Sequence, residues 1–187
     1  MAIVFTPERN KMTPPNQLRM TVYSALFVAL IAMGAFIAIP VGPVPIVLQN
    51  MFVLLAGLTL GPVWGLACVG IYLLIGLAGL PVFAGGTAGI GKLFGPTGGY
   101  LVAYLPAVFV TAAISKGLKK SIMADVIAMV TGSLIIYAIG VPWLKIAVSL
   151  SWQKAIAGGM LPFLIGDGLK IAAAAFLAKK IRPLVKE

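Results

Sequence analysis

The chain has 187 residues, of which 61% are hydrophobic and 10% are charged, whereas about 25% of the residues in an ordinary soluble domain are charged. This composition excludes a soluble globular domain and predicts a membrane protein, because a spanning helix needs roughly 20 apolar residues. The net charge of +10 does not indicate nucleic-acid binding, since the Lys and Arg residues stand at the edges of apolar runs. With no histidine and a single cysteine, we expect no intramolecular disulfide and no metal site.

The first half of the chain predicts a polar tail and three membrane spans. Residues 1–19 are expected to form a cytoplasmic tail with a short surface helix near Asn16–Arg19. Between the first two spans, Pro40–Asn50 holds three prolines, which fix φ and remove N–H donors, so a stiff loop is expected there. The predicted spans are Met20–Ile39, Ile46–Leu60 and Val63–Leu80.

The second half predicts a Gly-rich segment and three more spans. Seven glycines stand in Pro81–Gly99, a density that opposes a regular helix, and this apolar segment is expected to fold over the mouth of the bundle. The predicted spans are Tyr100–Ser115, Ile122–Val141, which Pro142 ends, and Gly158–Ala178. The expected fold is an all-α bundle of six transmembrane helices over residues 20–181, followed by a basic cytoplasmic tail at residues 182–187.

The distribution of Lys and Arg predicts the orientation of this bundle. With the N-terminus inside, ten basic residues fall on the inner side, and only Lys92, Lys145 and Lys154 fall in outer loops. Cytoplasmic loops of membrane proteins carry the excess of positive charge. We therefore expect a multi-pass membrane protein with both termini in the cytoplasm and a ligand entrance on the outside.

Asp167 and Lys170 form the most informative pattern in the chain. Ionisable residues within a span are energetically costly and usually face the bundle interior or a wet cavity. A spacing of three residues places both side chains on one face of the last helix. They form either a mutually neutralising pair that sets helix packing, or a ligand site in which the carboxylate accepts N–H groups and the ammonium neutralises a carboxylate or carbonyl.

Few other residues offer chemistry. Lys92 and Tyr100 are the notable polar groups of the Gly-rich region. Gln49 and Asn50 stand at the entry to the second span, where they either bind a ligand or cap the helix. Asp125 stands at the cytoplasmic start of the fifth predicted span, where a carboxylate suits the helix dipole. That leaves Asp167 as the one acidic residue deep within a predicted span, and there are no paired carboxylates for acid–base catalysis. We therefore expect no catalytic residues and no enzyme activity.

Small residues recur at four-residue spacing in the first span, at Ala25 and Ala29. In lipid, small residues let helices approach closely. This face serves either for packing inside the bundle or for docking of a partner protein.

Four segments together resemble one family. They are IPVGPVPIVLQ (Ile39–Gln49), GLPVFAGG (Gly79–Gly86), GPTGGYL (Gly95–Leu101) and DGLK (Asp167–Lys170). Their order and spacing are similar to those of BioY proteins, the biotin-binding S components of energy-coupling factor (ECF) transporters. The resemblance extends from about Thr21 to Ile181 and implies a six-helix protein that captures biotin from outside. It also implies a location in the cell membrane (the inner, or cytoplasmic, membrane) of a prokaryote.

The resemblance also implies roles for single residues. It places Asp167, Lys170 and Tyr100 at the ligand, and Ala25 and Ala29 at the transmembrane coupling protein. The remaining ligand candidates are Gln49, Phe83, Gly86, Gly89 and Lys92.

The resemblance implies partners as well. Two ATPase subunits would consume ATP, so this chain would need no cofactor of its own. It stays open whether the chain acts without these subunits, alone or as a homo-oligomer. The alternatives are an S component for another vitamin such as thiamin, and a structural membrane protein without a ligand.

Overall fold

The computed structural model describes residues 14–118 and 121–186, which form eight helices and one short hairpin. The long helices are α1 (Pro14–Phe36), α5 (Gly98–Gly117), α6 (Ile122–Ala147) and α8 (Leu161–Lys186). The shorter ones are α2 (Gln49–Leu60), α3 (Pro62–Leu77), α4 (Gly91–Phe94) and α7 (Trp152–Gly159). The strands β1 (Ala38–Ile39) and β2 (Ile46–Val47) form the hairpin. The mostly helical class expected from the sequence is confirmed.

Several of these helices suit a lipid environment. Four stretches are long and apolar enough to cross a membrane, at Asn16–Phe36, Gly98–Gly117, Ile122–Ala147 and Trp152–Val185, and two shorter apolar helices, α2 and α3, accompany them. Large apolar side chains point outward, among them Val63, which is 73% exposed, and Ile165, which is 83% exposed. Lipid tails on this surface remove the penalty that water would impose on it.

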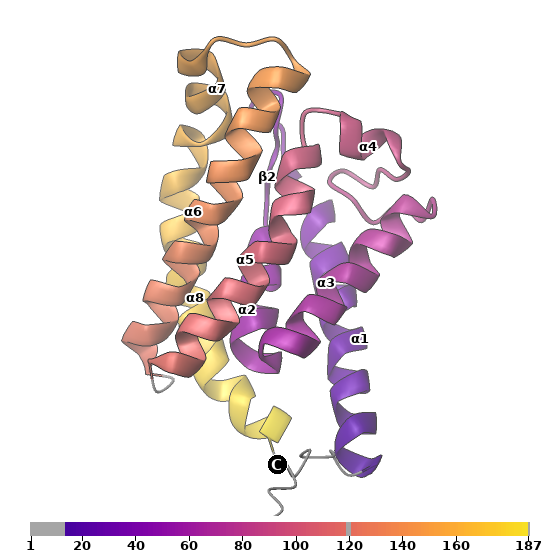
Figure 1. Cartoon of the computed structure of the whole chain (residues 1–187), viewed down its shortest axis with the longest axis vertical. Coiled ribbons are helices and arrows are strands. Elements are labelled where there is room, and N and C mark those ends of the chain that lie inside the picture. The colour runs from indigo at the N-terminus through magenta and orange to yellow at the C-terminus, as the bar shows by residue number, and fades with distance from the viewer. Residues whose placement is uncertain (1–13, 119–120, 187) are drawn as a thin grey trace, which may run out of the picture.

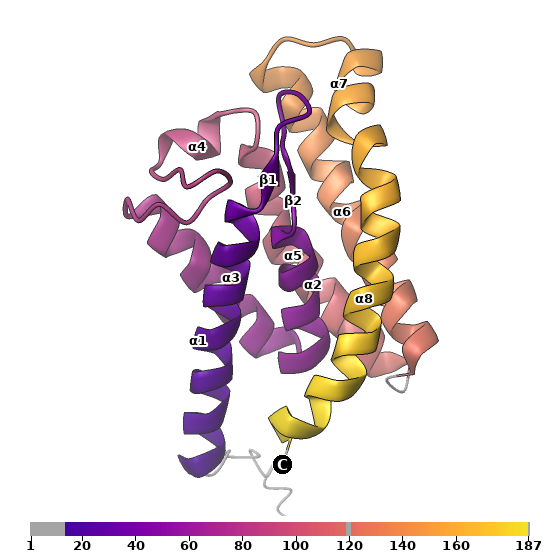
Figure 2. The same ribbon diagram turned by 180° about the vertical axis from the view of Figure 1, so that it is seen from behind.

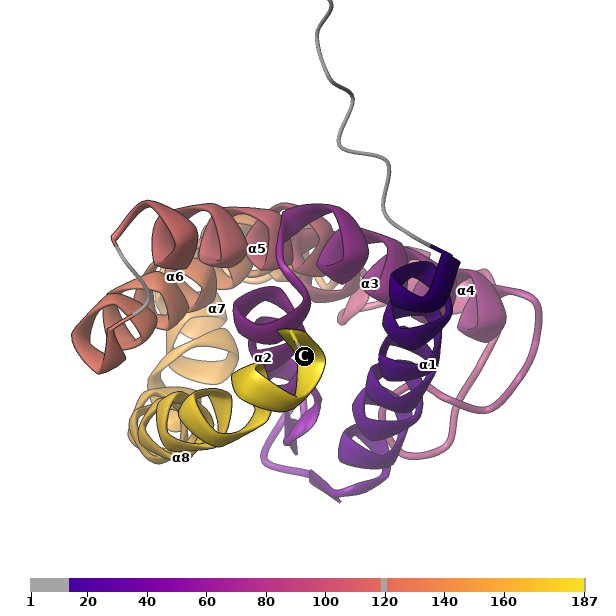
Figure 3. The ribbon, with the colours of Figure 1, turned by 90° about the horizontal axis from the view of Figure 1, so that it is seen from below.

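Helix α2 lies in the centre of the bundle, against α1, α3, α5, α6 and α8 (Figure 3). Ten of its twelve residues are buried. At Gly57 the backbone lies so close to α5 that an added Cβ would come within 2.7 Å of the Val108 carbonyl oxygen. A central helix that is apolar all round packs in this way because it has no face left for solvent or lipid.

The segment between α1 and α2 differs from the stiff loop expected there. Ala38 pairs with Val47 and Ile39 with Ile46, in antiparallel register. Figure 2 shows this hairpin rising from the start of α2 toward the end of the molecule that holds α7. The second span expected from Ile46 is therefore helical only from Gln49, because the preceding residues pair as a strand.

Proline does not end the fifth expected span. Helix α6 continues through Pro142 to Ala147, and the expected end at Val141 is wrong. In lipid there is no water to bind freed backbone groups, so the chain keeps its helical bonds around a proline instead of unwinding. The loop expected to follow contains a separate helix, α7, before α8 begins.

Both ends of the described chain lie at the same end of the molecule, opposite the hairpin, α4 and α7 (Figure 1). The short helix expected near Asn16–Arg19 forms the first turns of α1, while residues 1–13 fall outside the described part. Helix α8 continues to Lys186, so the expected tail at 182–187 is helical over its described residues, and Arg182 within it is buried. Of the basic residues expected inside, Lys119 and Lys120 fall outside the described residues.

Candidate ligand-binding site

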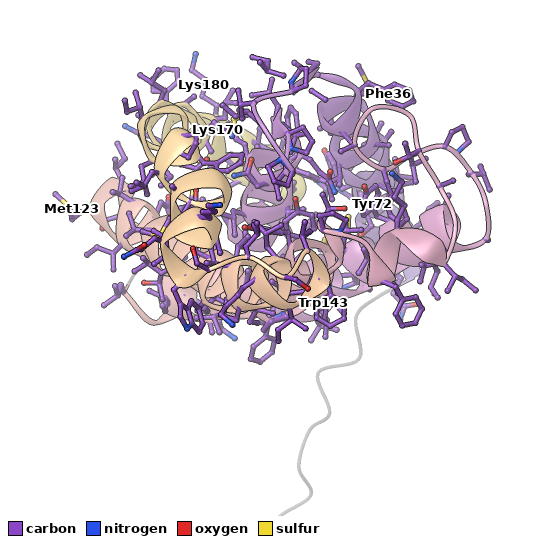
Figure 4. All side chains as sticks on the ribbon, turned by 90° about the horizontal axis from the view of Figure 1, so that it is seen from above. Phe36, Tyr72, Met123, Trp143, Lys170 and Lys180 are labelled. Atoms are coloured by element: carbon purple, nitrogen blue, oxygen red, sulfur yellow. The ribbon has the colours of Figure 1, made fainter. Side chains whose placement is uncertain are left out.

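A cavity of about 540 Å³ opens at the end of the bundle that holds the hairpin and α4. Its walls come from the β1–β2 hairpin, the start of α2, the Gly-rich segment 81–99 and helices α5, α6 and α8. Small-molecule pockets in proteins typically enclose about 300–1,000 Å³, so this cavity has the size for a small organic ligand. Figure 4 looks onto this end, with Met123 and Phe36 at the periphery.

The polar part of the cavity is built around Asp167 and Lys170, which are 5% and 8% exposed. Lys170 Nζ lies 3.1 Å from Asp167 Oδ1. Asn50 links the two, because its Nδ2 donates to Asp167 Oδ1 at 3.0 Å and its Oδ1 accepts from Lys170 Nζ at 3.1 Å. The hydroxyl of Tyr137 donates to Asp167 Oδ2. Four side chains from α2, α6 and α8 thus form one bonded cluster.

This cluster is close to neutral and keeps hydrogen-bonding capacity. A carboxylate has about four lone-pair positions and an ammonium has three donors. Asp167 uses three positions and Lys170 uses two donors within the cluster. One acceptor position on Asp167, one donor on Lys170 and the second N–H of Asn50 therefore remain for a ligand. Such a set suits a compact group that both donates and accepts, such as an amide or a urea.

The apolar wall is held in place by an aromatic contact. Phe83 is 1% exposed and meets the ring of Tyr72 edge-on, with centroids 5.7 Å apart. Gln49 Nε2 donates to the Tyr72 hydroxyl at 2.7 Å, and that hydroxyl donates to the Val82 carbonyl at 3.0 Å. A Cβ at Gly76 would overlap the Phe83 ring, so this glycine makes the close approach possible. Gln49 therefore faces the cavity while it fixes the wall.

The Gly-rich segment forms the outer cover of the cavity. Phe83 and Thr87 pair as an isolated bridge, and the turn between them uses positive φ at Gly85 and Gly86. The following helix α4 places Lys92 at the cavity wall, with its side chain partly buried. In the described residues no hydrogen bond or ion pair of the Lys92 ammonium is found, so its charge is available to a ligand.

The chain matches the BioY family over residues 8–187. The chain belongs to the BioY family. It is 41% identical over 171 residues to a biotin transporter BioY of Thermotoga maritima, covering 91% of this chain and 99% of that one. It is 42% identical over 158 residues to a probable biotin transporter BioY of Pyrococcus horikoshii, covering 84% and 93%.

A solved structure has the same fold. The S component for biotin from an ECF-type ABC transporter superposes with a TM-score of 0.87 at 32% identity, covering 92% of this chain and 95% of that one. BioY proteins are transporters, which confirms the expectation that this family member is not an enzyme. With its several apolar helices it is a multi-pass membrane protein of prokaryotic type.

Six of the eight ligand candidates named from the sequence line the cavity, namely Gln49, Phe83, Lys92, Tyr100, Asp167 and Lys170. Gly86 and Gly89 do not line it. Both have positive φ, and the Gly89 N–H donates to the Gly76 carbonyl at 2.8 Å. These two glycines do not line the cavity of this BioY-family protein. They shape its cover, because their positive φ angles are a backbone conformation that other residues rarely adopt.

Tyr100 has a fixed place in this site. Its hydroxyl donates to the Gly159 carbonyl at 2.8 Å, and its ring lies against Gly140, where a Cβ would be about 2.5 Å from ring carbons. The tyrosine therefore presents its ring to the cavity and uses its hydroxyl to hold the end of α7. Neither Trp143 nor Trp152 lines the cavity: Trp143 Nε1 donates to the Gly95 carbonyl at 3.0 Å, and the Lys145 ammonium lies over the Trp152 ring.

One member of the polar cluster, Tyr137, was missed by the sequence analysis. Asn50 lies directly after Gln49, and for both residues the sequence left capping and ligand binding open. Tyr137 sits in an apolar span with no charged neighbour, and only the packing of α6 against α8 brings it to Asp167. Tyr104 also lines the cavity, and its spacing of four residues from Tyr100 is the one signal in the sequence that points to it.

Proposed function

We propose that this chain captures biotin at the outer face of the cell membrane and delivers it inward as the S component of an ECF-type transporter. The observation that carries the proposal is the cavity with the Asp167–Lys170–Asn50 cluster at one end and Lys92 in its cover. The similarity to the biotin S component supports the choice of ligand.

The chemistry of biotin matches the two ends of this cavity. Its ureido group has two N–H donors and one carbonyl, which correspond to the free acceptor position of Asp167 and the free donors of Lys170 and Asn50. Its fused ring with a thioether is apolar, and Phe83 and Phe163 offer apolar walls. The acyl chain ends in a carboxylate, which needs a cation away from the ureido end. Lys92 supplies that cation.

Lys92→Met is expected to weaken biotin binding by about tenfold, because the ligand carboxylate then loses the cation that Lys92 offers in a partly desolvated site. Binding of biotin methyl ester, which has no carboxylate, should change less than twofold. Lys154→Met is the matched control, since Lys154 is an exposed lysine at the same end of the molecule and does not line the cavity. Equal losses for biotin and its ester would assign Lys92 a different role.

The arrangement of helices supports six membrane crossings with cytoplasmic termini. Helix α2 has 12 residues, or about 18 Å at 1.5 Å per residue, and a hydrocarbon core is about 30 Å thick. We propose that α2 crosses the inner part and that the hairpin before it continues the crossing. Non-helical backbone is tolerated at membrane depth where it lines a cavity, as Val44 and Val47 do here.

The first helix supports a docking role for a partner. Ala25 and Ala29 are exposed on α1. They therefore do not pack inside the bundle, which was the other interpretation of this face. We propose that the transmembrane coupling protein of an ECF complex packs against them. Its two ATPase subunits would use ATP, and this chain would need no cofactor of its own. A chain acting alone, or as a homo-oligomer, is the alternative.

Thermal unfolding of the purified protein tests the proposed ligand. Biotin at 100 times its dissociation constant should stabilise the fold by roughly 2.7 kcal/mol, and thiamin at the same concentration should not. Stabilisation by thiamin alone would indicate an S component for another vitamin. Stabilisation by neither compound would support a structural membrane protein without a ligand.

A further inference from the structure

A second buried polar cluster lies at the other end of the bundle, near the chain termini. Arg182 donates through Nη1 to Asp125 Oδ2 at 2.8 Å and through Nη2 to Asp125 Oδ1 at 2.6 Å. Nη2 also donates to Ser115 Oγ at 2.7 Å, and Ser115 Oγ donates to Asp125 Oδ1 at 2.7 Å. Arg182, Asp125 and Ser115 are 7%, 1% and 2% exposed. These three residues are called the inner cluster below.

The inner cluster joins the ends of four helices. Ser115 is in the last turn of α5, Asp125 is in the first turn of α6, and Arg182 is near the end of α8. Arg182 Nε also donates at 2.9 Å to the carbonyl of Leu58, in the last turn of α2. A carbonyl in that turn has no partner within its own helix. Figure 3 shows the end of α8 lying against α2.

The same four helices carry the polar cluster of the ligand cavity and Tyr100. Helix α2 supplies Asn50, α5 supplies Tyr100, α6 supplies Tyr137, and α8 supplies Asp167 and Lys170. On α8 buried residues recur every three or four positions, at Phe163, Asp167, Lys170, Ala174, Ala178, Arg182 and Val185, and Ala175 is buried beside Ala174. Such spacing lies on one face of a helix, so Arg182 shares its face with the residues of the cavity.

The buried charges of the inner cluster are paired at only one position of α8 along its axis. Between helices in lipid there is little hydrophobic attraction to favour a particular register. A slip of one turn moves a helix by 5.4 Å, and it would leave Arg182 and Asp125 as unpaired buried charges. That state is strongly unfavourable, and buried polar groups are known to select a register in this way. The same slip would carry Asp167 and Lys170 away from Asn50 and Tyr137.

We propose that Arg182, Asp125 and Ser115 are positioning residues for ligand binding, which set the height and rotation of α8 and so hold Asp167 and Lys170 in the cavity. Arg182 is 12 positions from Lys170, or about 18 Å along a helix, and it acts without touching the ligand. The last turn of α8 is also hydrogen-bonded to α1. The Leu184 carbonyl accepts from Arg19 Nη2 at 2.8 Å and from Tyr23 Oη at 2.9 Å. This inference rests on the proposed binding of biotin.

A double-mutant cycle tests it, with biotin affinity measured on folded, monodisperse full-length protein. Arg182→Met should weaken biotin binding at least fivefold in the wild-type background, and by a clearly smaller factor when Lys170 is already Met, because the part of the effect that passes through Lys170 is then already lost. Arg182→Lys, which keeps one cation in place, should recover part of the loss. Lys180→Met, an exposed lysine on the same helix, should bind as the wild type does.

Two results would overturn the proposal. One is unchanged biotin affinity in folded Arg182→Met protein. The other is a loss of affinity by the same factor in both backgrounds, which indicates a general structural effect. Should Arg182→Met not fold, Ser115→Ala replaces it. This change removes two hydrogen bonds and keeps the ion pair, and it should weaken binding about threefold with the same dependence on Lys170. Wild-type protein that binds no biotin would instead refute the proposed function itself.

Discussion

Lys170→Met and Asp167→Asn should each weaken biotin binding at least tenfold, and both should destabilise the folded protein. Each change removes a proposed contact to the ureido group and leaves one member of a buried cluster with fewer partners. Breaking a buried ion pair by removing one partner costs about 3–5 kcal/mol. Isothermal titration with biotin and thermal unfolding in the same detergent measure the two effects. Leu169→Ala, at an exposed position on the same helix, is the control for both.

The double variant Asp167→Leu with Lys170→Met separates binding from stability. Replacing both charges by apolar groups removes the unpaired charge, and such replacements are often neutral or stabilising. The double variant should therefore be more stable than either single variant and still bind no biotin. If it retained wild-type affinity, the pair would serve only helix packing, which is the other interpretation of this pattern.

Ala25→Trp and Ala29→Trp should abolish uptake that depends on a coupling protein while leaving biotin binding by the isolated chain unchanged. Both alanines are exposed on α1, and neither lines the cavity. A large side chain there prevents the close helix approach that small residues permit. Co-purification with the coupling protein and cellular biotin uptake measure the effect.

The matched control for the docking face is Ala173→Trp, which enlarges an exposed alanine on α8. It should leave both co-purification and uptake intact. Normal complex formation by Ala25→Trp and Ala29→Trp would show that the partner uses another surface. Normal uptake without complex formation would show that the chain transports biotin by itself.

The positions of single helices and of the charged pair could be predicted from the sequence, because both depend on local patterns. Apolar runs predict spans within a few residues, and the spacing of Asp167 and Lys170 places them on one face of a helix whatever surrounds it. Where the prediction failed, tertiary context decided. Helix α6 continues through Pro142 because lipid offers no alternative hydrogen-bond partner for the backbone. Ile46 pairs with Ile39 in a hairpin that no short-range pattern in the sequence predicts.

The partners of the charged residues could not be predicted, because they are distant in the chain. Asn50 and Asp167 are 117 positions apart, and Asp125 and Arg182 are 57 apart. Nothing in a single sequence connects such pairs. Asp125 looked like a carboxylate suited to a helix start, and Arg182 like part of a basic tail. Only the packing of α8 against α2, α5 and α6 shows that the two form one buried cluster.

Equilibrium binding of labelled biotin to the purified chain, without any partner protein, tests the proposed function and its site together. We expect one saturable site per chain, displaced by excess unlabelled biotin, unaffected by excess thiamin, and absent from the Asp167→Leu, Lys170→Met double variant. No saturable binding to the folded wild-type chain, or undiminished binding to the double variant, would contradict the assignment of this cavity as the biotin site.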